Sequence, residues 1–192
     1  MDFDFSFEQT LLAESVGKML CRFPTITDRP PFPYPASDVV RAASAAGLFE
    51  TADGAFLLGH VDAVAVAQEI GRRLPAAPLT EMLAAGLSLA GSQARIDAAL
   101  SEGETLGVAV AGRLRMGDGL VTGKILVPFA AETTLVIAPC ETDRGARWLT
   151  VETAAAEPHP AETFDITADA RWLSFEKTPV DQGNSLDSDR FS

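Results

Sequence analysis

Residues 105–127, TLGVAVAGRLRMGDGLVTGKILV, mark the point at which the chain changes its pattern. They open with a short apolar run rich in β-branched residues, which indicates a strand covered on both faces. Gly117-Asp118-Gly119 then separates two candidate strands, and such a turn is a good hairpin signal. Short apolar runs continue after the hairpin and predict a small β-barrel or sandwich: TTLVIAP, RWLTVET, TFDIT and RWLSFEKTPV.

Before this point the apolar residues recur at helical spacing, and five helices are predicted. Ser6 followed by Gln9 is a capping-box pattern at the start of the first helix. Its apolar stripe consists of Phe7, Leu11, Leu12, Val16, Leu20 and Phe23. Serine and threonine caps, with glycine or proline ends, predict later helices at 38–46, 60–74, 80–91 and 92–102, and Ser37 is the cap expected for the helix at 38–46. In the third helix the residues expected to face inward are Val61, Val64, Ala65, Ile70 and Leu74.

Helices followed by strands predict an α+β fold. We expect an all-helical domain at residues 1–103 and an antiparallel β-barrel or sandwich at residues 104–180. Within the second domain, the stretch AAAEPHPAE, residues 154–162, is predicted to be a loop. The polar residues 181–192 are predicted to form a disordered tail.

Charge and composition exclude several classes of function. The formal net charge of −12, from 15 basic and 27 acidic residues, repels phosphate polyanions, so nucleic acid is not expected as a partner. Cys21 and Cys140 are interpreted as buried thiols in a reducing compartment. His60 and His159 have no ligand-spaced partners, so no metal site is expected. No stretch has the roughly 18 to 20 apolar residues of a membrane span, and the acidic N-terminus lacks a signal-peptide pattern, so a cytoplasmic location is expected.

Five phrases of the sequence, in this order, resemble the acyl-CoA dehydrogenase family over residues 1–180. The most specific is VAVAQEIGRRLPAAPLTE, residues 64–81, which is similar to the family's EELGR helix and the proline-containing turn after it. LVTGKILVPFAAETTLVIA, residues 120–138, resembles a β-domain phrase of the family, with Gly123 and Lys124 at matching positions. The other three phrases are MDFDFSFEQTLLAESVGKML, VVRAASAAGLFE and FDITADARWLSFEKTPV. The alternative is an unrelated α+β protein that shares this patterning.

The resemblance implies a flavin-dependent reaction on an acyl-CoA thioester, in fatty acid or steroid degradation. In that family FAD takes a hydride from the β-carbon while a carboxylate removes the α-proton. The cofactor-binding residues implied here are Val110, Ala111, Val127 and Pro128. The family's base lies on a C-terminal helix, which we expect to lie outside this polypeptide, so no catalytic residue is assigned. Four carboxylates of the β-domain are interpreted as solvated surface groups: Glu152, Glu157, Glu162 and Glu176.

The sequence departs from the family's pattern where the flavin would lie. A loop of the type T-E-P-x-x-G-S-D has no counterpart, because TLGVAVAG runs directly into Arg113. In the phrase K-x-W-(I/V)-(S/T), Leu126 stands at the tryptophan position and Pro128 at the hydroxyl position. Proline offers neither an amide donor nor a hydroxyl. Trp148 and Trp172 can stack on a flavin or an adenine, but packing within the β-domain is the favoured interpretation.

Three functions are compatible with these observations. The first is a subunit without the base in a hetero-oligomeric dehydrogenase, with a homologous dehydrogenase subunit, or a second copy of the chain, as its partner. The second is a fragment of an ordinary dehydrogenase, and the third is a non-catalytic acyl-CoA-binding or structural module. We also expect an exposed apolar face larger than a few hundred Å², because the domain that covers the family's core lies outside this chain.

Overall fold

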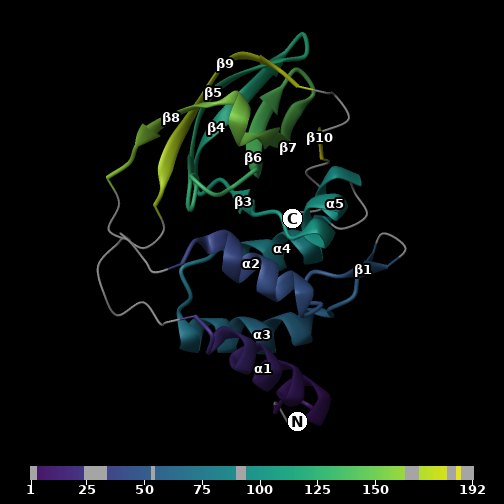
Figure 1. Ribbon diagram of the computed structural model, residues 1–192. Helices are drawn as coiled ribbons and strands as arrows, with labels where there is room; N and C mark the ends of the chain where they lie inside the picture. The colour runs from purple at the N-terminus through teal and green to yellow at the C-terminus, as the bar shows by residue number, and fades with distance from the viewer. Residues whose placement is uncertain are drawn as a thin grey trace.

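In the computed structural model a group of helices lies against one end of a twisted sheet (Figure 1). The structure describes residues 4–23, 34–52, 55–89, 94–162, 169–180 and 185–186. The described helices are α1 (Phe7–Leu20), α2 (Ala36–Ala45), α3 (His60–Arg73), α4 (Leu79–Leu89) and α5 (Ala94–Glu102). Between α2 and α3, a short antiparallel ribbon of β1 (Thr51–Ala52) and β2 (Ala55–Phe56) was not predicted.

The described strands after α5 form one sheet of eight strands. They are β3 (Leu106–Val108), β4 (Ala111–Gly117), β5 (Leu120–Val127), β6 (Leu135–Thr142), β7 (Gly145–Glu152), β8 (Glu157–Pro160), β9 (Arg171–Pro179) and β10 (Ser185–Leu186). The strand order is β10-β7-β6-β4-β5-β9-β8, and β3 pairs with β6 beside this path. The predicted α+β class, with helices first and strands second, is confirmed.

The sheet is mixed and open, whereas the sequence predicted an antiparallel barrel or sandwich. β4 with β5 and β6 with β7 are antiparallel hairpins, but β6 runs parallel to both β3 and β4. The parallel pairs arise because residues 128–134 carry the chain from the end of β5 across to the far side of β4. In the described part of the chain no ladder joins β8 to β10, so the sheet does not close.

β8 forms inside the stretch that was predicted to be a loop. It is an edge strand that pairs with β9. An edge tolerates Pro158 and Pro160 because the amides on its outer side need no partner strand. The strand predicted at residues 163–167 lies outside the described residues. Of the predicted tail, the structure describes Ser185–Leu186, which pairs with β7 as β10.

The predicted capping box of α1 is confirmed, but its predicted apolar stripe is wrong at one end. Gln9 N donates to Ser6 Oγ at 3.2 Å, and Ser6 N donates to Gln9 Oε1 at 2.9 Å. Val16 and Leu20 are buried as expected, whereas Phe7 is 79% exposed. The stripe is exposed at this end because the buried residues of α1 all lie in the second half of the helix, at Val16, Gly17, Met19 and Leu20.

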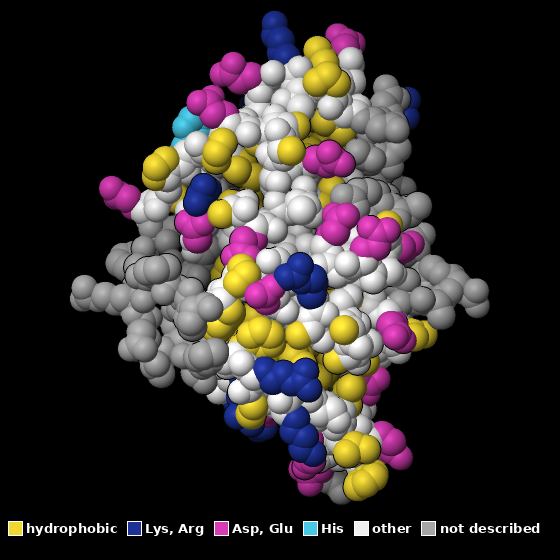
Figure 2. Space-filling model, viewed as in Figure 1, with side chains coloured by type: hydrophobic (Ala, Val, Ile, Leu, Met, Phe, Trp, Pro, Cys, Tyr) yellow, Lys and Arg dark blue, Asp and Glu magenta, His cyan; other side chains and the backbone are white. Residues whose placement is uncertain are grey.

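In α3, the predicted inward residues Val61, Val64 and Leu74 are exposed instead, although Ala65 and Ile70 are buried. The buried side of α3 carries two alanines, two larger apolar residues and one carboxylate: Ala63, Ala65, Val66, Ile70 and Glu69. Val61 and Val64 lie outside this buried side. Figure 2 shows hydrophobic side chains at the surface of the helical half, beside Lys and Arg side chains.

The contact between α1 and α3 depends on a glycine that faces a buried carboxylate. Glu69 is 8% exposed, and its oxygens accept from Arg73 Nε at 2.9 Å and Arg72 Nη1 at 3.2 Å. Burial raises the pKa of Glu69, but the hydrogen bonds from Arg73 and Arg72 outweigh it and leave the pKa below its usual value. A Cβ at Gly17 would overlap Glu69 Oε1 and lie 3.0 Å from Cδ. The glycine therefore makes room for the charged group.

The two cores of the molecule share strand β6. On one face of β6, Leu135 and Ile137 belong to the core between the helices and the sheet. On the other face, Val136, Ala138 and Cys140 belong to the core of the β part. Because successive strand residues point to opposite faces, a continuous apolar run serves both cores.

The start of α2 is capped from the sheet and not by the predicted Ser37. The helix begins at Ala36, and its N-cap residue Pro35 has no side-chain cap. Ser37 N donates to Glu132 Oε2 at 2.8 Å, and Glu132 lies in the segment between β5 and β6. A carboxylate at a helix N-terminus is favourable because it accepts from a free amide and faces the positive end of the helix dipole.

We predict that Gly17→Ala destabilises the protein, whereas Gly71→Ala in α3 does not. Alanine favours a helix interior by about 1 kcal/mol over glycine, but at position 17 its Cβ displaces the Glu69 carboxylate, and overpacking costs about 1–3 kcal/mol. Nothing lies within 4 Å of a Cβ at Gly71, so that variant should gain stability. Urea unfolding followed by circular dichroism measures both. Equal free energies of unfolding for the two variants would contradict the contact.

A second prediction concerns the cap on α2. Glu132→Ala should lower the free energy of unfolding by about 1 kcal/mol, the usual cost of losing a cap, and Glu132→Gln should retain part of it because the amide oxygen still accepts. The exposed Glu176 provides the control, because Glu176→Ala should change stability by less than about 0.5 kcal/mol. The cap would have no role if all three variants unfolded at the same urea concentration.

Candidate cofactor-binding face

The side of the sheet that points away from the β core is formed by β4, β5, β9 and β8. On β5, Val121, Ile125 and Val127 are fully buried. Lys124 and Leu126 alternate with them and point to the other side, where Lys124 is exposed and Leu126 is half-buried. We call this side the outer face.

One row of side chains crosses the outer face from strand to strand. Ala111 of β4 lies opposite Leu126, Leu126 lies opposite Trp172 of β9, and Trp172 lies opposite His159 of β8. Directly opposite residues of antiparallel strands share one face and lie close together. Leu126, Trp172 and His159 are half-buried, while Ala111 is exposed. The row is therefore a mainly apolar strip that is open to solvent.

The next row along the strands carries charge. Lys124 lies opposite Arg113 on one side and Ser174 on the other. The Lys124 ammonium lies 5.2 Å from the centroid of the Trp172 ring, within the range of a cation–π contact. Arg113 donates to Glu141 at 2.5 Å, and this hydrogen bond is the main reason that the pKa of Glu141 is lowered.

The structure brings the four predicted cofactor residues to one end of the outer face, where β4 begins and β5 ends. Val110 is 59% exposed, and its N–H donates to Leu126 O at 2.9 Å. Ala111 is exposed and Pro128 is half-buried. Val127 points the other way and is 0% exposed, so its side chain belongs to the β core. At Val127 only the backbone is available to a ligand on the outer face.

Sequence reasoning missed Lys124 as part of this face and favoured core packing for Trp172. The alternation of Trp172 and Ser174 with Leu173 and Phe175 separates the two sides of β9, and this signal is present in the sequence. The position of Trp172 opposite Leu126 depends on the register between β5 and β9, which no local pattern gives. Trp148 does pack against the core between helices and sheet.

Four described carboxylates that the sequence offered do not form a proton-abstracting site on this face. Glu152, Glu157, Glu162 and Glu176 are all exposed, as expected for surface groups. Glu157 lies opposite Ser174 at the exposed edge of the sheet. A general base must come within hydrogen-bond reach of its proton, and a carboxylate in open solvent at a sheet edge is not held in such a position.

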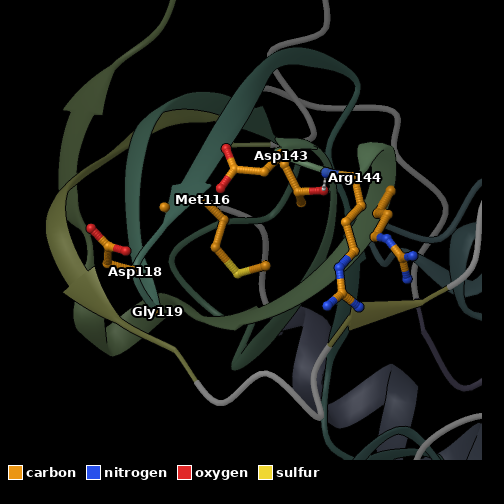
Figure 3. Close-up of a pocket in the computed structure, with 8 residues that line it drawn as sticks. Met116, Asp118, Gly119, Asp143 and Arg144 are labelled. Atoms are coloured by element: carbon orange, nitrogen blue, oxygen red, sulfur yellow. Dashed lines mark hydrogen bonds between the residues drawn. The ribbon is translucent and has the colours of Figure 1, made fainter.

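A separate pocket of about 220 Å³ lies at the far end of β4 and β5 (Figure 3). Asp118 and Gly119 of one hairpin turn form one side, Asp143 and Arg144 of another turn form the other, and the Met116 side chain points into the middle. Arg144 N donates to Thr142 Oγ1 at 3.1 Å, which shapes the second turn. The lining comes from the two hairpin turns and the strand ends beside them and carries two aspartates and two arginines, so the pocket is the gap between two hairpins.

The thiols and histidines give no sign of further chemistry. Cys140 is buried, and burial, followed by the charge of Glu141, raises its pKa. Cys21 was predicted to be buried but is exposed, at the C-cap position where α1 ends. The described ranges contain no group of three or more His, Cys, Asp or Glu that could hold a metal ion. In the same ranges, no helix has the length and apolar character needed to cross a membrane.

Solved structures of acyl-CoA dehydrogenases match the fold over nearly the whole chain. The ChsE4-ChsE5 complex from Mycobacterium tuberculosis superposes with a TM-score of 0.78 at 22% identity, covering 99% of this chain and 60% of that chain. The Tcur3481-Tcur3483 steroid ACAD G363A variant gives 0.73 at 17% identity, covering 95% and 58%. An acyl-CoA dehydrogenase complexed with FAD from Bacillus anthracis gives 0.72 at 15% identity, covering 96% and 39%.

These matches show that the chain has the fold of acyl-CoA dehydrogenases, as the sequence resemblance predicted. The chain spans about 60% of the length of the first two matched structures. At the level of sequence, no protein-family model and no curated protein matches it. The likeness to the solved structures therefore concerns the fold.

We predict that Gly112→Ala costs far more stability than Gly119→Ala. Both glycines have similar positive φ angles, 79° and 74°, so both variants bear the backbone strain of an L-residue there. At Gly112, a Cβ would also overlap Lys124 O and lie 3.0 Å from Ile125 Cα, whereas nothing lies within 4 Å at Gly119. The difference should reach at least about 2 kcal/mol in chemical unfolding. Equal costs would mean that β4 and β5 do not approach this closely beside the outer face.

Proposed function

We propose that this chain is the flavin-holding subunit, without the base, of a hetero-oligomeric acyl-CoA dehydrogenase that oxidises an acyl-CoA thioester. The observation that carries this proposal is the fold match to dehydrogenase structures through both the helices and the sheet. That match includes a structure with bound FAD and PigA with FAD and proline, the latter at a TM-score of 0.70 and 15% identity.

The residues of the outer face fit the flat part of a flavin. The row from Ala111 through Leu126 to Trp172 offers an apolar strip, and Lys124 and His159 offer polar groups at its border. Ligand sites commonly combine an apolar lining with a few polar groups that fix orientation. When bound, the flavin supplies the hydride acceptor of the reaction.

The same face offers few backbone donors to the polar edge of the ring. Val110 N–H already donates to Leu126 O, and Pro128 has no N–H. We therefore infer that this chain contacts the ring mainly through side chains, and that a second polypeptide supplies further hydrogen bonds to it.

The proton-abstracting carboxylate is also assigned to the partner. Within the described residues, the four carboxylates considered above are exposed and lie away from the apolar strip or at its open edge. The ChsE4-ChsE5 and Tcur3481-Tcur3483 structures are each named for two components. A two-component arrangement for this chain is part of the proposal.

The helical half has a surface suited to such a partner. Phe7 and Leu11 of α1 and Val61 and Val64 of α3 are each at least half exposed. Gln9 Nε2 donates to Asp62 Oδ1 at 3.0 Å, which holds the starts of the two helices side by side. Exposed apolar side chains that cluster at a surface often mark an interaction site, whereas single exposed ones do not. This observation supports a partner subunit or a second copy of the chain.

The exposed carboxylates also favour a second function, a non-catalytic acyl-CoA-binding or structural module. The two functions differ in whether flavin binds. We expect the purified chain to bind FAD saturably in an equimolar amount, measured by flavin fluorescence and absorbance. With acyl-CoA and an artificial electron acceptor, the chain alone should show no dehydrogenation, and co-expression with a homologous dehydrogenase subunit should restore it.

Two variants on the same strand sharpen this test. Leu126→Asp places a charge in the apolar strip and should raise the FAD dissociation constant at least tenfold. Thr122→Asp lies on the same side of β5 but toward the hairpin, and should leave it unchanged. Failure to take up FAD either alone or with the partner would select the non-catalytic module. Dehydrogenation by the chain alone would show that the base lies within it.

A further inference from the structure

Trp172 has the largest ring of the side chains in the apolar strip. Its cross-strand neighbour is Leu126, and Leu126 O accepts the Val110 N–H at one end of the apolar strip. Trp172 is half-buried, so one part of the indole rests on the sheet and another part faces solvent. It is therefore the largest flat surface that the described strip presents to a ligand.

Lys124 approaches the indole from one side only. Lys124 precedes Leu126 by two residues on β5 and lies opposite Ser174, so it reaches Trp172 diagonally from the hairpin end of the strand. Val110, Ala111 and Pro128 lie toward the other end of the strip. A ligand that lies along this row would approach the indole across the strands, whereas Lys124 reaches the indole along the strand direction.

The contact with Lys124 also orders the indole. The ammonium lies 5.2 Å from the ring centroid, and among the described residues no carboxylate forms an ion pair with it. Cation–π attraction holds an ammonium against the face of an indole, so it favours the position of Lys124 over the ring. The side chain of Trp172 is thereby kept in one orientation before a ligand arrives, which reduces the entropy lost on binding.

We propose that Trp172 is the residue against which the flavin ring stacks, and that Lys124 is a positioning residue that holds the indole for this contact. The proposal rests on the proposed function, since it names how the same face holds its cofactor. Stacking of a flat heteroaromatic ring on an aromatic side chain is tolerant of ring chemistry and strong enough to change affinity about tenfold or more.

The test compares dissociation constants for riboflavin and FAD, measured by flavin fluorescence on the full chain. Trp172→Leu should weaken both by about tenfold or more, and Trp172→Phe should weaken them less because the smaller ring still stacks. Trp148→Leu is the matched control: Trp148 packs against the other core and should leave both constants unchanged. Circular dichroism and urea midpoints confirm that each variant is folded.

Lys124 is tested by rescue. Lys124→Met should weaken riboflavin binding. In a Trp148→Phe background it should also make the fluorescence anisotropy of Trp172 decay faster, because the indole becomes mobile. Lys124→Arg should restore both, since a guanidinium also stacks on indole. If Lys124 has only a structural role, the anisotropy decay of Trp172 should be unchanged in both variants, and that result would overturn its positioning role.

The remaining outcomes separate this inference from the proposed function. If the wild-type chain binds FAD and riboflavin and Trp172→Leu binds them equally well, the stacking role is wrong and the flavin-holding function stands. If Trp172→Leu weakens FAD and ADP but not riboflavin, the indole contacts the adenine and the inference is likewise wrong. If the wild-type chain binds no flavin alone or with a partner subunit, both proposals fall.

Discussion

Strand β6 is buried on both faces, and the arrangement of the rest of the molecule depends on this double burial. Leu135 and Ile137 contact the helical side, while Val136, Ala138 and Cys140 contact the β core. Each face must be apolar because neither meets water, so one strand joins two cores at a fixed angle. β4 pairs with β6, and β5 and β9 follow from β4. β6 therefore fixes the position of the outer face, to which it contributes Glu141 as the ion-pair partner of Arg113 and Arg115.

The sequence predicted those features that depend on residues close together in the chain. The Ser6–Gln9 box, the glycine-rich turn after β4 and the change from helical to strand spacing all involve residues a few positions apart. The cap on α2 could not be predicted in this way, because Glu132 lies 95 residues from Ser37. The parallel pairing of β6 was missed for the same reason, since it depends on where a crossing segment places a strand and not on the composition of that strand.

The candidate site also combines local features, which the sequence could predict, with contacts between distant strands, which it could not. Alternation on β5 is a local property, and it places Leu126 and Pro128 on one side and Val127 on the other. The contact of Lys124 with Trp172 requires the register between β5 and β9, two strands that are far apart in the chain. The glycines at 112 and 123 contribute to that arrangement: their positive φ angles and the close backbone contacts at each bring β4 against β5. Close backbone contact with β4 therefore explains the glycine at position 123 of the phrase that resembles the family.

The edge strand β8 has a consequence for how the molecule can aggregate or assemble. An unpaired strand edge normally invites another chain to extend the sheet. Pro158 and Pro160 remove two amide donors from this edge, so a neighbouring strand would find an interrupted template. Fibril-like stacking through this side of the sheet is thereby discouraged. Association through this side of the molecule then depends on side chains and not on backbone groups of the edge strand.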